Sequence, residues 1–475
     1  MASSFPTLAI GAAGLQPQGS FAEAQAAYLH PDPALVAELD ALLRGRNMGI
    51  VAHFYMDAEL QGVLTALSWP HVRIADSLMM ADVAVQMAQT GVTALAVLGV
   101  DFMSENVRAV LDAAGHADVR VYRLAPEEIG CSLAESADSP AYEAWLRRAG
   151  QTPNALHVVY INTSLLTKAR AHSLVPTITC TSSNVVQTIL QAAAQIPDVQ
   201  IHYGPDTYMG ANLQALLTRV AGLPQAAIRD LHPAHDRESL LSLLDRFVYF
   251  RQGACIVHHM FGDDVVRRVQ AEHADALLTA HLEVPGEMFA LAAAAQAQGR
   301  GVVGSTSNIL NYILGAVDGA LSSPDPQVLP VVLGTEAGMV TSIVRQVQTR
   351  LQASGRDDVQ VQIVFPVAGE AIAADDSELA IIPGVASGEG CSVAGGCATC
   401  PFMKMNSLQA LFDVVLAVGT PDQERLRDHH PRAYVERIAG RTVADLGSEP
   451  ILHMRHFQRT GALPDALITD VATRD

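Results

Sequence analysis

Three of the six cysteines stand within ten residues of one another near the C-terminal end of the chain. They are Cys391, Cys397 and Cys400, and they follow a glycine-rich run whose backbone can adopt angles that other residues resist. Pro401 comes next, and residues 403–418 have the apolar spacing of a helix. A thiolate just before a helix N-terminus is stabilised by the helix dipole, and thiolate is the form of cysteine that binds metal.

The local spacing of these cysteines is compatible with three kinds of site. They are a redox-active pair, half of a structural zinc site, and part of an iron–sulfur cluster. A fourth ligand close in the sequence is missing, so a metal bound here must recruit cysteines from distant parts of the chain. The other cysteines are Cys131, Cys180 and Cys255. Spacing alone leaves the three possibilities open.

Length and composition limit the class of protein. The 475 residues correspond to about three domains of roughly 150 residues. Because 49% of the residues are hydrophobic and only 5% are aromatic, the core must consist mainly of Ala, Val, Leu and Ile, which suits α/β domains with buried parallel strands. The net charge of −19 argues against nucleic acid or an anionic membrane as a partner.

The cysteine content and the N-terminal segment predict a protein of a reducing compartment. Six scattered cysteines do not make a secreted disulfide scaffold, and no apolar run is long enough for a membrane span. Residues 1–34 lack the basic segment of a signal peptide and the arginines of a transit peptide. They are rich in Pro, Gly and Ala and are expected to form a flexible arm with one short helix at Phe21–Tyr28. These features together predict a cytoplasmic protein.

The rest of the chain repeats a pattern of apolar strand, polar strand end and helix. We expect α/β domains at residues 35–130, 131–253 and 254–399, followed by a segment at 400–475 that contains the last cysteine, a helix and a tail packing back on the first domain. Residues 423–438 have a helical pattern. Because ligands of open α/β sheets bind outside the carboxyl ends of the strands, three such sets of strand ends would form one polar pocket between domains.

Nine short motifs in this chain resemble, in the same order, those of the quinolinate synthase family, the A protein of de novo NAD biosynthesis. The motifs are Ala52–Tyr55, Asp76–Leu78, Gly130–Ala134, Tyr160–Asn162, Cys180–Ser182, Cys255–His258, His281–Glu283, Gly304–Thr306 and Cys400–Asn406. The resemblance runs from about His53 to Leu416 and is to the long, plastid-type form. The sulfur-transfer domain fused to plastid enzymes has no counterpart among these residues.

The resemblance implies both a fold and a cofactor. The fold is three similar three-layer αβα domains in a pseudo-threefold arrangement around a central 4Fe-4S cluster. The cluster would be held by three cysteines, which by motif are Cys131, Cys255 and Cys400. A cluster with one open iron can act as a Lewis acid on a substrate oxygen or amine, whereas a fully ligated cluster can only carry electrons.

The other cysteines are then non-ligands. Cys180 is interpreted as a small buried hydrophobe. Cys391 and Cys397 could form a disulfide that removes Cys400 from the iron. Under the competing hypothesis of an iron–sulfur or zinc sensor or assembly scaffold, the metal would instead be bound by Cys391, Cys397 and Cys400. A non-redox dehydratase of the aconitase type, acting on another acid, is the third hypothesis.

The reaction implied by the resemblance is a transferase reaction of pyridine nucleotide biosynthesis. It condenses iminoaspartate with dihydroxyacetone phosphate to quinolinate, with loss of phosphate and two waters. The implied partners are L-aspartate oxidase or aspartate dehydrogenase, which would supply iminoaspartate, and the iron–sulfur assembly machinery. Glu283 and His281 would move protons, and a dry pocket would raise the pKa of Glu283. Tyr55 would help to close the ring.

The same resemblance assigns the substrate-binding residues: His53, Ser77, Tyr160, Ile161, Asn162, Ser182, His281, Glu283, Ser305 and Thr306. A serine or threonine before a helix can also be a simple N-cap, and both roles are compatible. His258 and His259 are expected to lie on a strand and to point to opposite faces, which argues against a metal site made of both.

Overall fold

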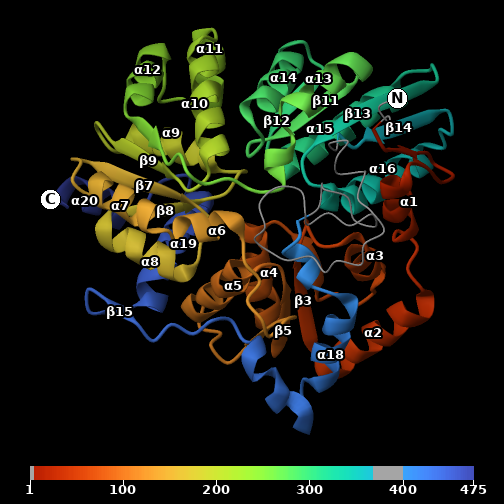
Figure 1. Cartoon of the computed structure of the whole chain (residues 1–475), viewed down its shortest axis with the longest axis horizontal. Coiled ribbons are helices and arrows are strands. Elements are labelled where there is room, and N and C mark those ends of the chain that lie inside the picture. The colour runs from red at the N-terminus through yellow and green to blue at the C-terminus, as the bar shows by residue number, and fades with distance from the viewer. Residues whose placement is uncertain (1–4, 367–399, 475) are drawn as a thin grey trace.

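The computed structural model describes residues 5–366 and 400–474, and these form three α/β units built on separate sheets (Figure 1). In the first unit four parallel strands lie in the order β4-β3-β5-β6. Its elements are α2 (Pro33–Arg46), β3 (Met48–His53), α3 (Ala58–Ala66), β4 (Val72–Ala75), α4 (Ser77–Gln89), β5 (Ala94–Leu98), α5 (Asp101–Ala113) and β6 (Arg120–Arg123). The β3 and β5 strands are buried along their whole length, as expected of strands covered by helices on both faces.

The second unit has four parallel strands in the order β8-β7-β9-β10. Its strands are β7 (Ala155–Tyr160), β8 (Thr177–Cys180), β9 (Gln200–Gly204) and β10 (Phe247–Tyr249). Its helices are α6 (Ser132–Ala137), α7 (Pro140–Ala149), α8 (Leu165–Leu174), α9 (Val185–Gln195), α10 (Thr207–Ala221), α11 (Gln225–Leu231) and α12 (Arg237–Asp245). Two short helices, α11 and α12, thus connect α10 to β10.

The third unit has parallel strands in the order β12-β11-β13-β14. Its strands are β11 (Leu277–His281), β12 (Gly301–Gly304), β13 (Gln327–Gly334) and β14 (Val359–Val364). Its helices are η1 (His258–Met260), α13 (Asp263–Glu272), α14 (Gly286–Ala297), α15 (Thr306–Ser322), η2 (Ala337–Met339) and α16 (Val340–Ser354). Numbered within each unit, the strands of all three units thus lie in the order 2-1-3-4. In sheets of this kind, ligands bind in a crevice at the carboxyl ends of the strands.

The N-terminal segment contains the expected short helix but is not the flexible arm expected for residues 1–34. It forms β1 (Thr7–Ile10), β2 (Leu15–Gln18) and α1 (Ser20–Ala27), and β1 pairs antiparallel with β14. Leu8 and Ile10 alternate with polar or smaller neighbours and are fully buried in the third unit. Two apolar residues make too short a pattern to distinguish an edge strand from a loop, but their burial fixes this segment to the sheet.

The C-terminal segment lies across the first two units instead of returning to the first alone. It consists of η3 (Met403–Met405), α18 (Leu408–Ala417), η4 (Pro421–His429), β15 (Arg437–Ile438), β16 (Arg441–Thr442), α19 (Val443–Thr460) and α20 (Asp465–Thr473). In Figure 1 α18 lies beside α2, where Arg46 Nη2 donates to Leu416 O at 3.4 Å. The α19 helix packs against α8, and His453 Nδ1 lies 3.1 Å from Thr177 O of the second unit.

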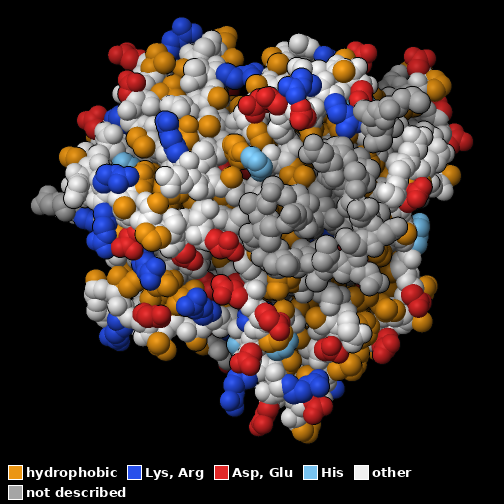
Figure 2. Space-filling model, viewed as in Figure 1, with side chains coloured by type: hydrophobic (Ala, Val, Ile, Leu, Met, Phe, Trp, Pro, Cys, Tyr) orange, Lys and Arg blue, Asp and Glu red, His pale blue; other side chains and the backbone are white. Residues whose placement is uncertain are grey.

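The helix predicted at residues 423–438 does not form. Pro421–His429 makes 3₁₀ turns, and the backbone of this part bonds to the first sheet, where Arg123 donates to Asp428 O at 2.8 Å. None of the helices in the described part of the chain combines the length and apolarity that crossing a bilayer requires. On the face shown in Figure 2, acidic and basic side chains are interspersed.

We expect Gly447→Ala to weaken the attachment of α19 to α8. A Cβ at Gly447 would lie 2.3 Å from Leu165 O and 2.9 Å from Leu165 Cγ, so the helices must separate. Overpacking of this kind costs about 1–3 kcal/mol, which lowers the thermal unfolding temperature. The matched control is Gly315→Ala in α15, where a Cβ meets no atom within 4 Å and the gain is about 0.5–1 kcal/mol. An unchanged unfolding temperature for Gly447→Ala would contradict this packing.

Candidate active site

The carboxyl ends of the three sheets face one cavity of about 80 Å³. Its wall includes residues that follow the first, second, third and fourth strands of the units. All fourteen residues that the family resemblance assigned lie on this wall: His53, Tyr55, Ser77, Cys131, Tyr160, Ile161, Asn162, Ser182, Cys255, His281, Glu283, Ser305, Thr306 and Cys400. Asp76, His258, Glu336 and Met403 also line it. The structure thus gathers segments that are more than 300 residues apart in the sequence.

The first strands of two units end in the same local arrangement. After β3, His53 Nδ1 accepts a hydrogen bond from the Tyr55 backbone N at 3.2 Å. After β11, His281 Nδ1 accepts from the Glu283 backbone N at 3.4 Å. An accepting Nδ1 leaves the ring proton on Nε2. Burial lowers the pKa of His53 to about 3 and that of His281 to about 4, so both rings are neutral at pH 7.

Three helix N-termini follow the second strands and point to the same cavity. They belong to α4, α9 and α15, and each carries unpaired backbone N–H groups and the positive end of a helix dipole. Asp76 caps α4 by accepting from Leu78 N, so Ser77 is not needed as the cap. Ser305 does cap α15, by accepting from Asn308 N at 3.3 Å. These termini suit bound carboxylate or phosphate groups.

Each of three cysteines follows the fourth strand of one unit and precedes a helical turn. Cys131 follows β6, Cys255 follows β10, and Cys400 is the corresponding residue after β14. All three are free and half-buried. Cys180 ends β8, is fully buried and does not line the cavity. Cys391 and Cys397 lie outside the described residues.

The surroundings of the three cysteines suit thiolate ligands of a metal cluster. Burial raises the pKa of the Cys131 thiol to about 12 and also raises the pKa values of Cys255 and Cys400. At every site, backbone N–H groups of the following turn hydrogen-bond to the sulfur and oppose this rise in pKa. They belong to Leu133 and Ala134 at Cys131, to His258 at Cys255, and to Phe402 and Met403 at Cys400. Such N–H groups stabilise a sulfur that carries negative charge, and bound iron would supply the remaining stabilisation. The donor set therefore fits an iron–sulfur cluster.

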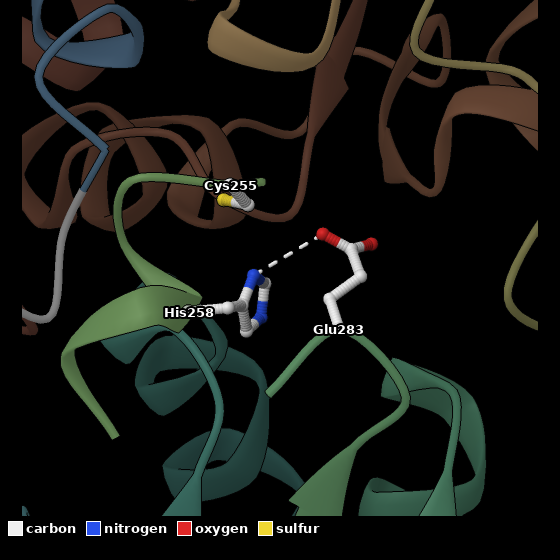
Figure 3. Close-up of side chains that lie close together, drawn as sticks. All are labelled: Cys255, His258 and Glu283. Carbon is white, nitrogen blue, oxygen red and sulfur yellow. Dashed lines mark ion pairs between the residues drawn. The ribbon is translucent and has the colours of Figure 1, made fainter. Parts of the chain in front are cut away.

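Glu283 lines the cavity and lies beside His258 (Figure 3) and His281. Its Oε2 is 3.2 Å from His258 Nδ1, its Oε1 is 3.6 Å from His281 Nδ1, and Tyr160 OH donates to Oε1. Burial alone would raise the pKa of Glu283, but the adjacent His258 and the Tyr160 hydroxyl lower it to about 2. The expected raised pKa is therefore wrong, because the sequence did not show that His258 stands next to this carboxylate.

His258 is the main site residue that the sequence interpretation missed. The alternation argument does not apply, because His258–Met260 forms a 3₁₀ turn instead of a strand. His258 is fully buried and stacks on His281 with ring centroids 4.9 Å apart, whereas His259 contacts Tyr208 away from the cavity. One ligand atom each of Cys255, His258 and Glu283 lies within 4.8 Å of the others. The three-residue spacing from Cys255 to His258 was the available signal.

Glu336 is a second buried carboxyl group in the cavity and also had no assigned role. It follows β13, is 2% exposed, and its Oε2 has no hydrogen-bond partner among the described residues. Burial raises its pKa well above the usual range, and the charge of Glu283 adds to this shift. In the same cavity Glu283 is thus ionised and Glu336 is neutral, so Glu283 can act as a base and Glu336 as a hydrogen-bond donor.

Tyr55 completes this part of the wall. Its hydroxyl lies 3.1 Å from Thr306 Oγ1 and 3.5 Å from Thr335 Oγ1, and its ring packs edge-on against His53. Burial raises the pKa of Tyr55 well above 10, so the phenol keeps its proton. A protonated phenol held by two threonines can donate a hydrogen bond into the cavity.

Comparison with known proteins finds matches along most of the chain. A family model described as Quinolinate synthetase A protein matches residues 37–422. The chloroplastic quinolinate synthase of Nicotiana tabacum is 54% identical over 99% of this chain and 67% of its own length. The corresponding Arabidopsis thaliana protein is 52% identical over 98% of this chain. A Synechococcus quinolinate synthase is 27% identical over 85% of this chain and 94% of its own.

These matches favour the enzyme over the sensor, the scaffold and a dehydratase acting on another acid. The chain spans about two thirds of the length of the plant relatives. Four plant relatives, at 50–54% identity, are chloroplastic enzymes, which contradicts the predicted cytoplasmic location. That prediction depended on the composition of residues 1–34, and β1, β2 and α1 in this segment belong to the folded third unit.

Proposed function

The chain belongs to the quinolinate synthetase A protein family and has quinolinate synthase activity, and we propose that the cavity between its three units is where the reaction takes place. The substrates are iminoaspartate and dihydroxyacetone phosphate, and the products are quinolinate, phosphate and two waters. The observation that carries this proposal is the shared cavity, which three thiols, three helix N-termini and the Glu283 carboxylate line together. Each of these groups matches a need of that reaction.

The three units form a pseudo-threefold arrangement around this cavity. The identical strand order of the units supports this, as does the position of one cysteine after the fourth strand of each. The domains at residues 35–130, 131–253 and 254–399 each contain one parallel sheet. A site at the junction of three similar units can take one ligand from each.

Cys131, Cys255 and Cys400 would hold a 4Fe-4S cluster, and three ligands leave one iron free. When bound, that iron supplies Lewis-acid chemistry toward a substrate oxygen or amine. Thiolates are the ligands that iron–sulfur iron prefers. The residues of the chain itself then bind the substrates, exclude water and move protons.

The helix N-termini would bind the anionic groups of the substrates. Ser77, Ser182, Ser305 and Thr306 stand at these termini and offer hydroxyl donors beside the backbone N–H groups. His53, Tyr160, Ile161 and Asn162 complete the binding surface between the first and second units. Neutral donors and helix dipoles hold carboxylate and phosphate without the desolvation cost of a buried cation.

Glu283 would be the proton acceptor. It is ionised, buried and aligned by the Tyr160 hydroxyl and by His258, so it can take a carbon-bound proton during isomerisation and dehydration. The neutral His281 carries its proton on Nε2, which has no partner among the described residues and can donate to a substrate oxygen. Tyr55 donates a hydrogen bond during ring closure.

The test is quinolinate formation by protein purified and assayed without oxygen. Iminoaspartate is generated in the assay from aspartate by an L-aspartate oxidase with fumarate as the electron acceptor, or by an aspartate dehydrogenase with an oxidised nicotinamide cofactor. These enzymes are the proposed functional partners, and dihydroxyacetone phosphate is added. Cluster assembly is reconstituted with iron and sulfide, in place of the proposed assembly machinery. Quinolinate should appear only with both substrates. Its absence from protein that carries a complete cluster would refute the proposal.

A further inference from the structure

A lysine stands fully buried behind the wall of the cavity. Lys168 lies on α8 with no exposed surface, and its Nζ donates to two backbone carbonyls, Ile161 O at 3.1 Å and Thr163 O. Its ammonium also lies 6.0 Å from the centre of the Phe102 ring. The carbonyls belong to the turn after β7, and Phe102 and Ile161 themselves line the cavity. Lys168 is thus one residue removed from the cavity surface.

The turn that Lys168 holds carries part of the proposed substrate surface. It runs from Tyr160 to Thr163, and Thr163 Oγ1 donates to Tyr160 O at 3.1 Å. Tyr160 OH donates to Glu283 at one side, and Asn162 lines the cavity at the other. Fixing the carbonyls on both sides of Asn162 therefore sets the direction of its side chain and of the Tyr160 hydroxyl.

A carboxyl group from another unit acts on the charge of this lysine. Glu105 belongs to α5 of the first unit, is 4% exposed, and accepts from Leu165 N at 2.7 Å at the start of α8. Its other oxygen accepts from the Tyr434 hydroxyl of the C-terminal segment at 2.7 Å. The charges that act on Lys168 are those of Glu105 and Asp138. Helix α8, helix α5 and the C-terminal segment therefore meet at Glu105, whose charge acts on Lys168.

A lysine is a costly residue at a fully buried position. Burial lowers the pKa of Lys168 to about 7, because the charged form loses its hydration there. The carbonyls of Ile161 and Thr163 need donors in any folded chain, so a purely structural role would involve the same hydrogen bonds. A role in positioning the substrate-binding turn differs from a purely structural role in one respect. In a positioning role, the effect of Lys168 on activity depends on the side chain of Asn162.

We propose that Lys168 is a positioning residue, whose ammonium, backed by Glu105 of the first unit, fixes the Tyr160–Thr163 turn so that Asn162 and Tyr160 meet the substrate. The inference rests on the proposed function, because it needs this turn to bind substrate. It assigns no contact between Lys168 and the substrate. It also makes the junction between the first and second units part of the catalytic geometry.

The test is a double-mutant cycle between Lys168→Met and Asn162→Ala in the complete, cluster-loaded protein. Methionine keeps the length of the side chain and removes the ammonium. We expect Lys168→Met to lower kcat/KM by about 10–100-fold, since small misplacement of a positioning group has such effects. Because both changes act on the same contact, the double variant should be no worse than the poorer single variant. Visible cluster absorption should stay at the wild-type level.

The control is Leu243→Ala on α12, a fully buried position of the same unit that does not line the cavity. It should lower the unfolding temperature and leave kcat/KM unchanged, which separates loss of stability from loss of position. If Lys168→Met does not fold, Lys168→Gln, which keeps one donor group, is used in the same cycle.

The outcomes separate this inference from the function on which it rests. If Asn162→Ala keeps full activity, Asn162 does not bind substrate and the positioning role is refuted, whereas the proposed reaction stands. If the cluster-loaded wild-type protein forms no quinolinate, the proposed function itself is refuted. If Asn162→Ala is impaired but Lys168→Met is fully active, only the positioning role is refuted. Losses that multiply in the double variant would likewise refute it, because they would show that Lys168 acts independently of Asn162.

Discussion

Replacing Cys131, Cys255 or Cys400 by serine, one at a time, should abolish visible cluster absorption and reduce quinolinate formation to the assay background. Each sulfur follows the fourth strand of a different unit and lies on the same cavity wall, so no neighbouring thiol of the described residues can replace it. A serine hydroxyl does not provide the thiolate that iron–sulfur iron requires. Absorption near the cluster bands and iron content of anaerobically purified protein measure the first effect, and the coupled assay measures the second.

Cys180→Ala is the matched control for the three ligand variants. Cys180 is also a cysteine at the end of a site strand, but it is fully buried and outside the cavity, so the cluster and the activity should both remain. The sequence predicts the same result for Cys391→Ser and Cys397→Ser, which lie outside the described residues. A cluster that survives Cys131→Ser, or one that is lost with Cys180→Ala, would contradict the ligand assignment.

The periodicity of the sequence was sufficient to predict most of the architecture. Continuous apolar runs such as residues 49–52 and 94–98 are typical of strands buried on both faces, and the polar residues after them indicated which edge of each sheet faces the cavity. The α/β class with three parallel sheets is therefore confirmed. The same reasoning failed at β1, because four residues paired to β14 from the other end of the chain carry no pattern of their own.

The site was predictable as a set of residues but not as a set of charges. Strand ends such as His53 and His281 could be found, because the carboxyl ends of parallel strands meet at one edge. The ionisation of Glu283 depends on His258, which comes from a segment 25 residues earlier and becomes its neighbour only in the folded chain. Lys168 likewise resembles an ordinary helix lysine in sequence. Its burial depends on α5 and on the C-terminal segment, which sequence periodicity does not place.

Glu283→Gln should leave the cluster intact and lower kcat for quinolinate formation by about 10²–10⁴-fold, the usual contribution of a general base. Glutamine keeps the shape of the side chain and can still accept the hydrogen bond from Tyr160, but it cannot take up a proton. Because the pKa of Glu283 is held at about 2, the wild-type group is ionised throughout the neutral range, so the variant should be impaired equally at pH 6 and pH 8. Normal turnover by this variant would show that the base lies elsewhere.

Glu336→Gln is the decisive comparison, because it makes the same change from carboxyl to carboxamide at a second buried residue of the same cavity. The raised pKa of Glu336 keeps it neutral, and a carboxamide is a neutral donor of the same shape, so activity should change by no more than about threefold. A loss as large as that of Glu283→Gln would mean that Glu336 gives up its proton during turnover, and the separation of roles between the two carboxyls would then be wrong. A large loss at Glu283 with a small one at Glu336 would instead assign proton removal to the carboxylate beside His258, since burial and shape are matched in the two variants.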